Sequence, residues 1–452
     1  MSIGIDSQPS LVHSSDIDFA VKADPDTENA TVSNDVSSKQ NQDRSQPGRI
    51  EPPPDGGWKA WLQVLGSWML IFNTWGIVVT FGDYQSFYES GELFTQTSSN
   101  ISWIGSIQAF LVFATGAVAG PIFDRGHLKP LLVIGTFCLV FGHMMLSLCK
   151  EYWQALLAQG FMVGIGAGCL FVPSLAVMQP YFSRHLGLAI GIAATGSSLG
   201  GVIYPVIFIN LIDRLGFGWT VRIIGFVSLG TLLVPITISK MRVKPAGVRK
   251  MFDPSAFRDG PYLLCIFACF LGYTGCYTAF YYISLYGESK KWMDSHMSLY
   301  LVAILNASSI LGRTVPNWVS DWTGPTNVVI PGSFLTGVVL LCNLAVESEA
   351  GIICTAVFTG FFSGIFIATP PLLFVALTKD KSKIGTRMGM AFALLGLGVL
   401  TGGPGSGGVL QRDPGRMDWT GTWTYGGVFT LSSGVCFVIL RLWLVGFKIK
   451  EK

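Results

Sequence analysis

Twelve long apolar stretches, joined by short polar connections, fill most of this sequence. Each stretch can cross a lipid bilayer as a helix, which takes about 20 apolar residues. Charged residues make up only 13% of the 452 residues, whereas soluble domains contain about 25%. The pattern predicts an all-α membrane protein with twelve transmembrane helices. We place the spans at residues 58–82, 101–123, 129–149, 153–179, 186–210, 219–239, 260–285, 297–319, 327–346, 350–377, 387–410 and 422–446.

The longest connection in the middle of the chain, residues 240–259, separates two groups of six spans. We therefore predict one six-helix bundle over residues 55–239 and a second over residues 260–446. Residues 1–54 are rich in polar residues and proline and contain hardly any aromatic residue, so we expect a disordered cytoplasmic tail. Residues 447–452 form a short tail at the other terminus.

Basic residues are concentrated on one side of the predicted membrane. With the N-terminus in the cytoplasm, the loops on that side hold most of the lysines and arginines, a bias that sets orientation in membrane proteins. We therefore predict that both termini are cytoplasmic. We expect the plasma membrane, because no organelle signal is visible. The basic residues of the predicted inner loops are Arg125, Lys129, Arg184, Lys240, Arg242, Lys244, Arg249, Lys250, Arg258, Lys379, Lys381, Lys383 and Arg387.

The two predicted bundles resemble each other weakly in sequence. Residues 120–126, Gly-Pro-Ile-Phe-Asp-Arg-Gly, follow the second span, and a looser version at residues 316–324 follows the eighth. Residues 184–189 open the fifth span in the way that residues 387–391 open the eleventh. Each match pairs one span with the span six places later, which is typical of transporters built from two parallel repeats.

No catalytic or metal-binding pattern stands out in the sequence. The nine cysteines lie in or beside apolar stretches and form no Cys-x-x-Cys pair, so we expect packing residues without disulfides or metal. The sequence has no Walker-type segment for ATP and no Ser/His/Asp set. A net charge of +3 gives no sign of nucleic-acid binding. We predict neither an enzyme nor a cofactor.

Ionisable residues inside membrane spans are costly and usually functional. Arg313 lies in the eighth span, where it either pairs with an anionic group of a cargo, or extends to the inner surface or clamps a helix carbonyl. Asp83 follows the first span and either binds protons or is solvated in a loop. His143, in the third span, either relays protons or is a structural histidine. The spans contain few other acidic residues, so proton coupling and facilitated diffusion both stay open.

A row of phenol rings marks the seventh span. Tyr273, Tyr277 and Tyr281 are spaced four residues apart and therefore share one face of a helix. They can stack against a flat or aromatic cargo, or they can pack between helices. Further candidates for cargo contacts are Asn73, Trp75 and Asn306, and the two asparagines can equally cross-link helices.

Several motifs together resemble a known family. Residues 120–129 resemble the loop motif between the second and third helices of the major facilitator superfamily. With further segments, the chain resembles the monocarboxylate-porter family of that superfamily, and more closely its fungal branch. The likeness covers residues 54–446. The further segments are residues 54–58, 73–76, 101–106 and 216–219 with Arg222, Asn306 with Gly312 and Arg313, and residues 386–391.

This resemblance implies a carrier with two six-helix bundles that moves a small organic solute by alternating access. It implies that the seventh helix lines the central cavity. It also implies that Asp124 and Arg125 latch the cytoplasmic side in the outward-open state, and the alternative for this pair is a turn that only sets topology. Some fungal members that resemble this chain carry riboflavin or sit beside secondary-metabolite pathways.

Two departures from the family pattern bear on the cargo. Animal lactate carriers have a lysine in the first span, but residues 76–80 contain none, and Ser309 stands where those carriers have an aspartate. Arg313 is kept. We therefore predict that the cargo is a monocarboxylate-like anion or a secondary metabolite, with export slightly favoured. The alternative is a non-transporting sensor of the same fold, although the tail after residue 446 is short for a signalling domain.

Overall fold

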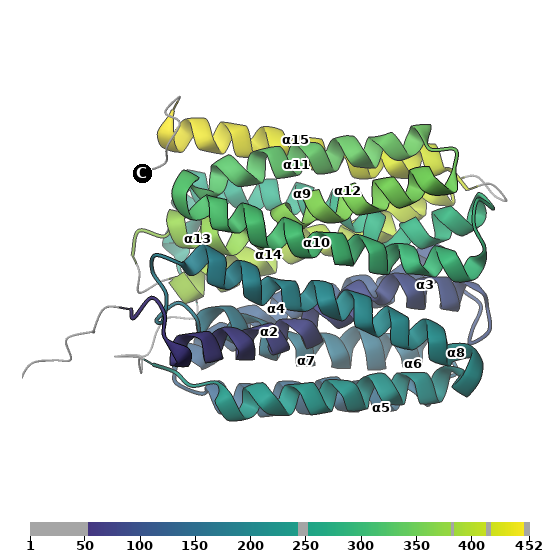
Figure 1. Ribbon diagram of the computed structural model, residues 1–452, viewed down its shortest axis with the longest axis horizontal. Coiled ribbons are helices and arrows are strands. Elements are labelled where there is room, and N and C mark those ends of the chain that lie inside the picture. The colour runs from purple at the N-terminus through teal and green to yellow at the C-terminus, as the bar shows by residue number, and fades with distance from the viewer. Residues whose placement is uncertain (1–52, 243–251, 381–383, 413–416, 447–452) are drawn as a thin grey trace, which may run out of the picture. The chain divides into compact units, whose positions relative to one another are not determined.

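The computed structural model describes residues 53–242, 252–380, 384–412 and 417–446. Most of the predicted N-terminal tail, part of the central loop and the C-terminal tail lie outside these residues. Within the described residues, every regular element is a helix and none is a strand (Figure 1). The prediction of an all-α protein is confirmed.

The first half of the chain forms the N-terminal bundle. One of its spans combines α6, a π-helix named η1, and α7 in one continuous helix. A second span is broken at Thr80, after which the short helix α3 continues. The helices are α2 (Trp58–Val79), α3 (Phe81–Glu89), α4 (Ser98–Asp124), α5 (Leu128–Leu146), α6 (Tyr152–Ala155), η1 (Leu156–Val163), α7 (Gly164–Ala176) and α8 (Leu186–Ile238).

The second half forms the C-terminal bundle. Thr369 separates α12 from α13, and Pro370 at the start of α13 lacks the N–H that would continue the helix before it. The helices are η2 (Pro254–Arg258), α9 (Gly260–Ser289), α10 (Ser295–Thr323), α11 (Pro325–Cys342), η3 (Asn343–Ala345), α12 (Glu349–Ala368), α13 (Pro370–Leu377), α14 (Ile384–Leu410) and α15 (Trp419–Val445).

Helix α8 contains two of the twelve spans. It has 53 residues, which would extend for about 80 Å if straight, whereas a bilayer core is about 30 Å thick. The chain turns at Gly216, whose φ of 71° and ψ of 169° are non-helical and suit glycine because it has no Cβ. The described residues contain eleven helical segments that are long and apolar enough to cross a membrane. With the two arms of α8 counted separately, the structure agrees with the twelve predicted helices.

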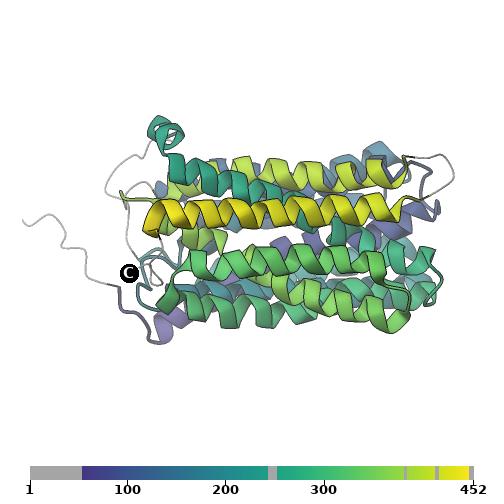
Figure 2. The same ribbon diagram turned by 90° about the horizontal axis from the view of Figure 1, so that it is seen from above.

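The outer helices present an apolar surface. On α5, Val133, Ile134 and Phe137 are each more than half exposed, and Phe226 and Leu233 on the second arm of α8 are equally exposed. In water such a surface would cost free energy, whereas lipid tails match it. Figure 1 shows α5 at one edge of the helices and α15 at the opposite edge, and Figure 2 shows α15 from its outer side. The arrangement therefore fits a protein surrounded by a bilayer.

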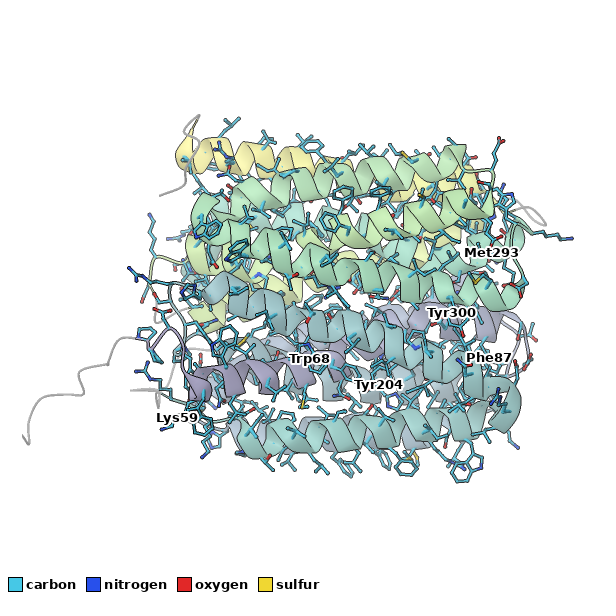
Figure 3. The ribbon with its side chains drawn as sticks, in the orientation of Figure 1. Lys59, Trp68, Phe87, Tyr204, Met293 and Tyr300 are labelled. Carbon is cyan, nitrogen blue, oxygen red and sulfur yellow. The ribbon has the colours of Figure 1, made fainter. Side chains whose placement is uncertain are left out.

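The helices define two ends, which we name by the chain termini. The tail end is where α2 begins and α15 ends, and the far end is the opposite one. Figure 3 shows Lys59 at the tail end and Met293 and Tyr300 towards the far end. At the far end, side-chain oxygens accept backbone N–H groups at helix starts, as Thr97 does for α4 and Asp418 for α15.

Two long seams join the bundles. Helix α4 packs along α14, and the first arm of α8 packs along α10. The helices approach closely because small residues lie between them: a Cβ added at Gly191 would lie 2.8 Å from the carbonyl oxygen of Arg313, and one at Gly389 would lie 3.2 Å from Cα of Ala117. The glycine-rich fifth and eleventh spans thus lie at the contacts between the two bundles.

Candidate functional site

A cavity lies between the two bundles, with about 50 Å³ of room for the centre of a water-sized sphere. Helices α2, α4, α7 and α8 line it from the N-terminal bundle, and α9, α10, α12, α13 and α14 line it from the C-terminal bundle. The aromatic residues of its wall are Trp75, Phe113, Phe171, Tyr273, Tyr277, Phe280 and Phe392.

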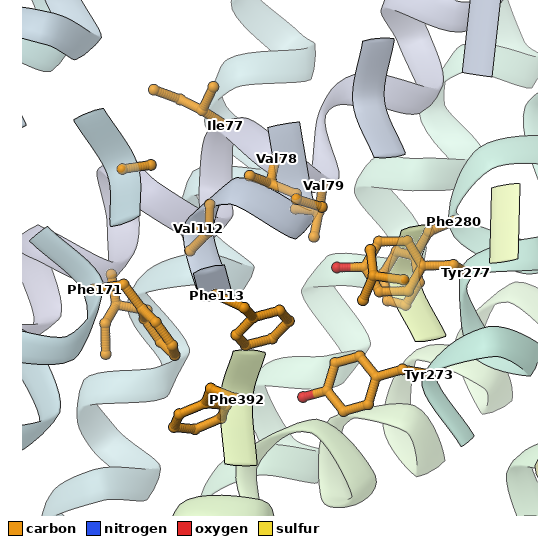
Figure 4. Packing of buried hydrophobic residues seen from close by; sticks show 14 of the residues in the cluster. Ile77, Val78, Val79, Val112, Phe113, Phe171, Tyr273, Tyr277, Phe280 and Phe392 are labelled. Atoms are coloured by element: carbon orange, nitrogen blue, oxygen red, sulfur yellow. The ribbon is translucent and has the colours of Figure 1, made fainter. Parts of the chain in front are cut away.

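The aromatic rings form one connected wall that crosses a seam. Phe113 of α4 stacks on Phe392 of α14, with ring centroids 5.3 Å apart and planes inclined by 9°. Trp75 lies 4.8 Å from Phe113, and Phe171 lies 5.3 Å from Phe392, both measured between centroids. Figure 4 shows Phe113 and Phe392 beside Tyr273 of α9, and Phe113 meets the Tyr273 ring edge to face with centroids 5.9 Å apart. Such a wall offers flat apolar surfaces on which another ring can stack.

Arg313 is the charged residue of the described cavity lining. Its side chain reaches from α10 to α8, where Nη1 donates to the carbonyl oxygen of Ala194 at 3.2 Å and to Oγ of Ser197. Its Nε–H has no hydrogen-bond partner among the described residues, and the residue is only 3% exposed. The guanidinium therefore lies in the cavity wall and does not extend to the surface. Its bond to the Ala194 carbonyl is the helix-carbonyl contact of the structural alternative, while its Nε–H is left for a cargo.

The phenol row of α9 divides between two places. Tyr273 and Tyr277 line the cavity, and Figure 4 shows their hydroxyl groups directed towards the N-terminal bundle. The Tyr273 hydroxyl donates to the carbonyl oxygen of Ile367 at 3.4 Å. Tyr281 lies outside the cavity lining and contacts Phe81 edge to face, with centroids 5.3 Å apart. Two of the three predicted phenols are thus placed to meet a cargo.

Asn73 lies outside the cavity lining and connects helices. Its Nδ2 donates to the carbonyl oxygen of Met69 at 2.7 Å, and its Oδ1 accepts from the Tyr204 hydroxyl at 2.7 Å and from Thr231 at 3.0 Å. These bonds join α2 to both arms of α8. The cross-linking alternative therefore explains this asparagine.

Asn306 also lies outside the cavity lining, at the seam between α8 and α10. Its Nδ2 donates to the carbonyl oxygen of Val302 at 2.9 Å, and its Oδ1 has no partner among the described residues. Nearby, the hydroxyl groups of Ser309 and Ser198 lie 2.6 Å apart. A neutral hydrogen bond thus joins the two bundles at Ser309.

At the tail end, an aspartate of one bundle caps a helix of the other. Asp321, in the last turn of α10, accepts the backbone N–H groups of Gly187 at 3.0 Å and Leu188 at 3.2 Å, at the start of α8. The negative charge also opposes the positive end of the α8 dipole. In the sequence, Asp321 lies within the repeat of the 120–126 motif, but we predicted no role for it. The repetition of that motif was the available signal.

The predicted gating pair lies at the equivalent place in the N-terminal bundle. Asp124 ends α4 and is 6% exposed, and α4 packs along α14 of the other bundle. Arg125 is exposed at the surface of the tail end. The acidic member is therefore buried near a seam, whereas the basic member faces outwards.

Asp55 fixes the start of α2 to the connection before α8. Its carboxylate accepts the backbone N–H groups of Ser183 and, at 2.7 Å, of Arg184, while its own N–H donates to the carbonyl oxygen of Tyr181 at 3.1 Å. Partial burial acts to raise the pKa of Asp55, but the N–H groups around it outweigh this effect, so the pKa lies below its usual value. The following Gly57 has a φ of 83°, which explains a glycine there.

The far end is closed by contacts of a different kind. Helix α3 packs on α9, and Asp83 in α3 is fully buried. Solvation of Asp83 in a loop, one of the two expectations, does not fit this position. Across the other seam, Gln411 Nε2 donates to the hydroxyl oxygen of Ser98 at 2.8 Å.

His143 lies away from the cavity lining. It is 2% exposed in α5, and its Nδ1 lies 2.8 Å from the carbonyl oxygen of Leu139. A Cβ added at Gly225 on the second arm of α8 would lie 3.1 Å from Cβ of His143. These contacts match the structural-histidine alternative.

Sequence reasoning did not identify the rings of Phe113, Phe171 and Phe392. The chain contains 31 phenylalanines, so a single one carries no distinguishing signal. Phe113 and Phe392 are also 279 positions apart (392 − 113), and only the packing of α4 on α14 brings them together.

Comparisons with known proteins agree with this architecture. The sequence pattern of the Major Facilitator Superfamily matches residues 60–348. The MFS-type transporter dbaD of Emericella nidulans is 55% identical over 387 residues, which are 85% of this chain and 87% of that protein. The aspyridones efflux protein apdF of the same organism is 37% identical, covering 80% and 74% of the two chains.

A solved structure shows the same fold. The crystal structure of the human organic anion transporter MFSD10 superposes with a TM-score of 0.67 at 13% sequence identity, covering 84% of this chain and all of that one. Two apolar bundles around a shared cavity, the sequence match and the structural match lead to one assignment. The narrower monocarboxylate-porter assignment stays a prediction. This chain belongs to the major facilitator superfamily of transporters.

Proposed function

We propose that this protein exports a small organic metabolite that carries an aromatic or flat unsaturated part and an acidic group. The observation that carries this proposal is the cavity between the bundles, whose wall combines a continuous set of aromatic rings with one buried guanidinium. The relative apdF is an aspyridones efflux protein, which supports export of a secondary metabolite. The human organic anion transporter is too distant in sequence to inform the cargo, and its likeness concerns the fold alone.

The acidic group of the cargo would bind at Arg313. A buried cation in an apolar site is costly unless a negative charge compensates it, and the described lining contains no carboxylate. The unpartnered Nε–H leaves a donor that an anionic oxygen can accept. Each charge-assisted hydrogen bond contributes about 1.5–3 kcal/mol. The cargo would supply the missing negative charge.

The flat part of the cargo would lie against the rings. Phe113 and Phe392 belong to different bundles and are stacked on each other, so cargo entry would separate or extend this contact. Tyr273, which meets Phe113 edge to face, and Tyr277 also line the cavity and add hydroxyl groups that can bind polar substituents. Because the rings come from both bundles, cargo bound there would stabilise the state in which the bundles are closed around it.

Transport would proceed by alternating opening of the two ends. The tail end is held by the cap that Asp321 provides to α8, and the far end by α3 on α9 and by the Ser98–Gln411 hydrogen bond. Rocking of one bundle against the other would release one set of contacts at a time. The distribution of basic residues supports a cytoplasmic tail end.

The first experiment compares metabolites in cells and in medium for the source strain with and without the gene. We expect one acidic aromatic compound to accumulate in cells that lack the gene and to decline in their medium. A compound that stays unused in the medium would indicate import instead. Unchanged pools under conditions in which the gene is expressed would favour a sensor of the same fold.

The compound found in this way then tests Arg313 directly. We expect Arg313→Ala to weaken binding to the purified protein by about 10- to 150-fold, which corresponds to about 1.5–3 kcal/mol. Arg222→Ala is the matched control, because Arg222 donates to the hydroxyl oxygen of Ser147 outside the cavity. Equal affinity of the Arg313→Ala and wild-type proteins would refute the role of Arg313.

A further inference from the structure

A buried carboxyl group lies at the far end. Asp83 is 0% exposed, and neither of its carboxyl oxygens has a hydrogen-bond partner among the described residues. Only its backbone is held, since its N–H donates to the carbonyl oxygen of Thr80 at 3.1 Å. Capping and ion pairing, the structural roles that usually explain a buried aspartate, therefore do not explain this one.

An ionised carboxylate in this position would be very costly. Transfer of an unpaired charge into an apolar interior costs far more than transfer of the neutral group, and such groups take up a proton instead. In the conformation with a closed far end, Asp83 therefore carries a proton. The same side chain is free to ionise once water reaches it.

A pocket at the far end adjoins Asp83. Asp83 lines this pocket, which α3, α8, α9 and α10 surround and which has about 720 Å³ of room for the centre of a water-sized sphere. The titratable groups that face it are Asp213 on α8, Glu288 on α9 and Glu92 after α3, and no Lys, Arg or His belongs to its described lining. Tyr84 adds a buried phenol beside Asp83. An acidic mouth of this kind raises the local proton concentration.

The helix that carries Asp83 is covered by the other bundle. Helix α3 belongs to the N-terminal bundle but packs on α9 and α10 of the C-terminal bundle. The neighbouring Gly82 lies so close that an added Cβ would be 2.6 Å from the carbonyl oxygen of Phe280 and 3.2 Å from Val302. Separation of the bundles at the far end would remove this cover.

We propose that Asp83 is a proton-binding carboxyl group that must be protonated before the far end closes. The step is the addition of one proton from the far-end solution to one carboxylate oxygen, and opening of the far end permits its loss. The proposal rests on the alternating-access function above and adds a coupling ion to it. With the far end outside the cell, inward movement of protons would then accompany export.

The first test follows the carboxyl group by infrared difference spectroscopy. The full-length protein is placed in lipid vesicles without cargo, and the pH is stepped from acidic to alkaline in sodium-free buffer. We expect a band of a protonated buried carboxyl group to disappear in wild type and in the Asp213→Asn control, and to be missing throughout in Asp83→Asn. The same band in Asp83→Asn would overturn the proposal, as would a wild-type response that requires sodium.

The second test links protonation to closure of the far end. Ser86, which lines the same pocket, is replaced by cysteine, and its labelling by a bulky impermeant maleimide is measured above the background of the parent protein. We expect acidification to reduce labelling when Asp83 is present. In the Asp83→Asn protein labelling should stay low at every pH. The ratio of the labelling rates of the two proteins at each pH cancels the pH dependence of the reagent itself.

The same pH response in Asp83→Asn and in its parent would overturn the link. Asp83→Glu keeps a titratable group and should restore the response, which separates protonation from misfolding. Both tests omit the cargo, so they are independent of transport. Cargo export without a pH response that depends on Asp83 would refute only this inference. A pH response that depends on Asp83, found without cargo export, would refute only the proposed function.

Discussion

Removal of the Asp321 carboxylate should shift the protein towards a state that is open at the tail end. This side chain caps the first turn of α8 from the other bundle through two backbone N–H groups. Loss of an N-terminal cap costs about 0.5–2 kcal/mol, and loss of the favourable charge at a helix start costs about 0.3–1 kcal/mol. Because the two effects overlap, we expect Asp321→Ala to cost about 1.5 kcal/mol.

This cost applies only to conformations in which the bundles touch at the tail end. A difference of about 1.4 kcal/mol changes an equilibrium tenfold, so the ratio of closed to open tail end should fall by about that factor. Hydrogen–deuterium exchange of the segment around Phe392 measures the change. That residue lines the cavity and is not part of the cap, so faster exchange there reports opening and not the lost hydrogen bonds.

Asp418→Ala provides the matched control. Asp418 accepts the N–H of Gly421 at 2.8 Å in its own helix α15, so its loss removes a cap without removing a contact between bundles. We expect both variants to lower the thermal stability, and only Asp321→Ala to speed exchange around Phe392. If the two variants give the same exchange there, Asp321 is an ordinary cap and the reasoning fails.

Two further predictions concern local stability. The pKa of Asp55 is lowered in the folded protein, so its carboxylate stabilises the fold above the unfolded-state pKa, and this contribution is lost as the pH falls through the lower folded-state pKa. Asp55→Asn should therefore reduce the acid sensitivity of thermal unfolding. An unchanged dependence of the melting temperature on pH would contradict the assignment. Gly312→Ala should destabilise by about 1–3 kcal/mol, because the added Cβ would collide with the carbonyl oxygen of Phe361. Gly230→Ala is its control, since nothing lies within 4 Å of a Cβ there, and equal melting temperatures of the two variants would show that α10 and α12 can separate freely.

The helices were predictable because bilayer thickness imposes their length. A run of about 20 apolar residues has few alternatives to a membrane helix, so the spans follow from composition and spacing. Helix α3 was not predicted, because its sequence, Phe81–Glu89, mixes polar and apolar residues and its conformation depends on packing against α9. The position of the turn in α8 was not predicted either, because a glycine at position 216 allows its φ of 71° but does not require it.

The candidate site was predictable only where the residue type is unusual for its surroundings. An arginine and three tyrosines in apolar spans attract attention, and Arg313, Tyr273 and Tyr277 do line the cavity. Asn306 is equally unusual, yet it lies at a seam, because which face of a helix meets the cavity depends on its rotation in the bundle. The phenylalanine rings of the cavity wall could not be predicted, because they come together only when spans that are distant in the sequence pack against each other.

The turn within α8 has a mechanical consequence. Within Leu186–Ile238, all of which the structure describes, only Gly216 departs from helical geometry, so the connection between the two arms contains no slack. The first arm touches α10 at the seam, whereas the second arm exposes Phe226 and Leu233 at the outer surface. A force that the lipids apply to the outer arm, such as a change in bilayer thickness, is therefore transmitted directly to the seam, and transport should respond to the lipid chain length of the membrane.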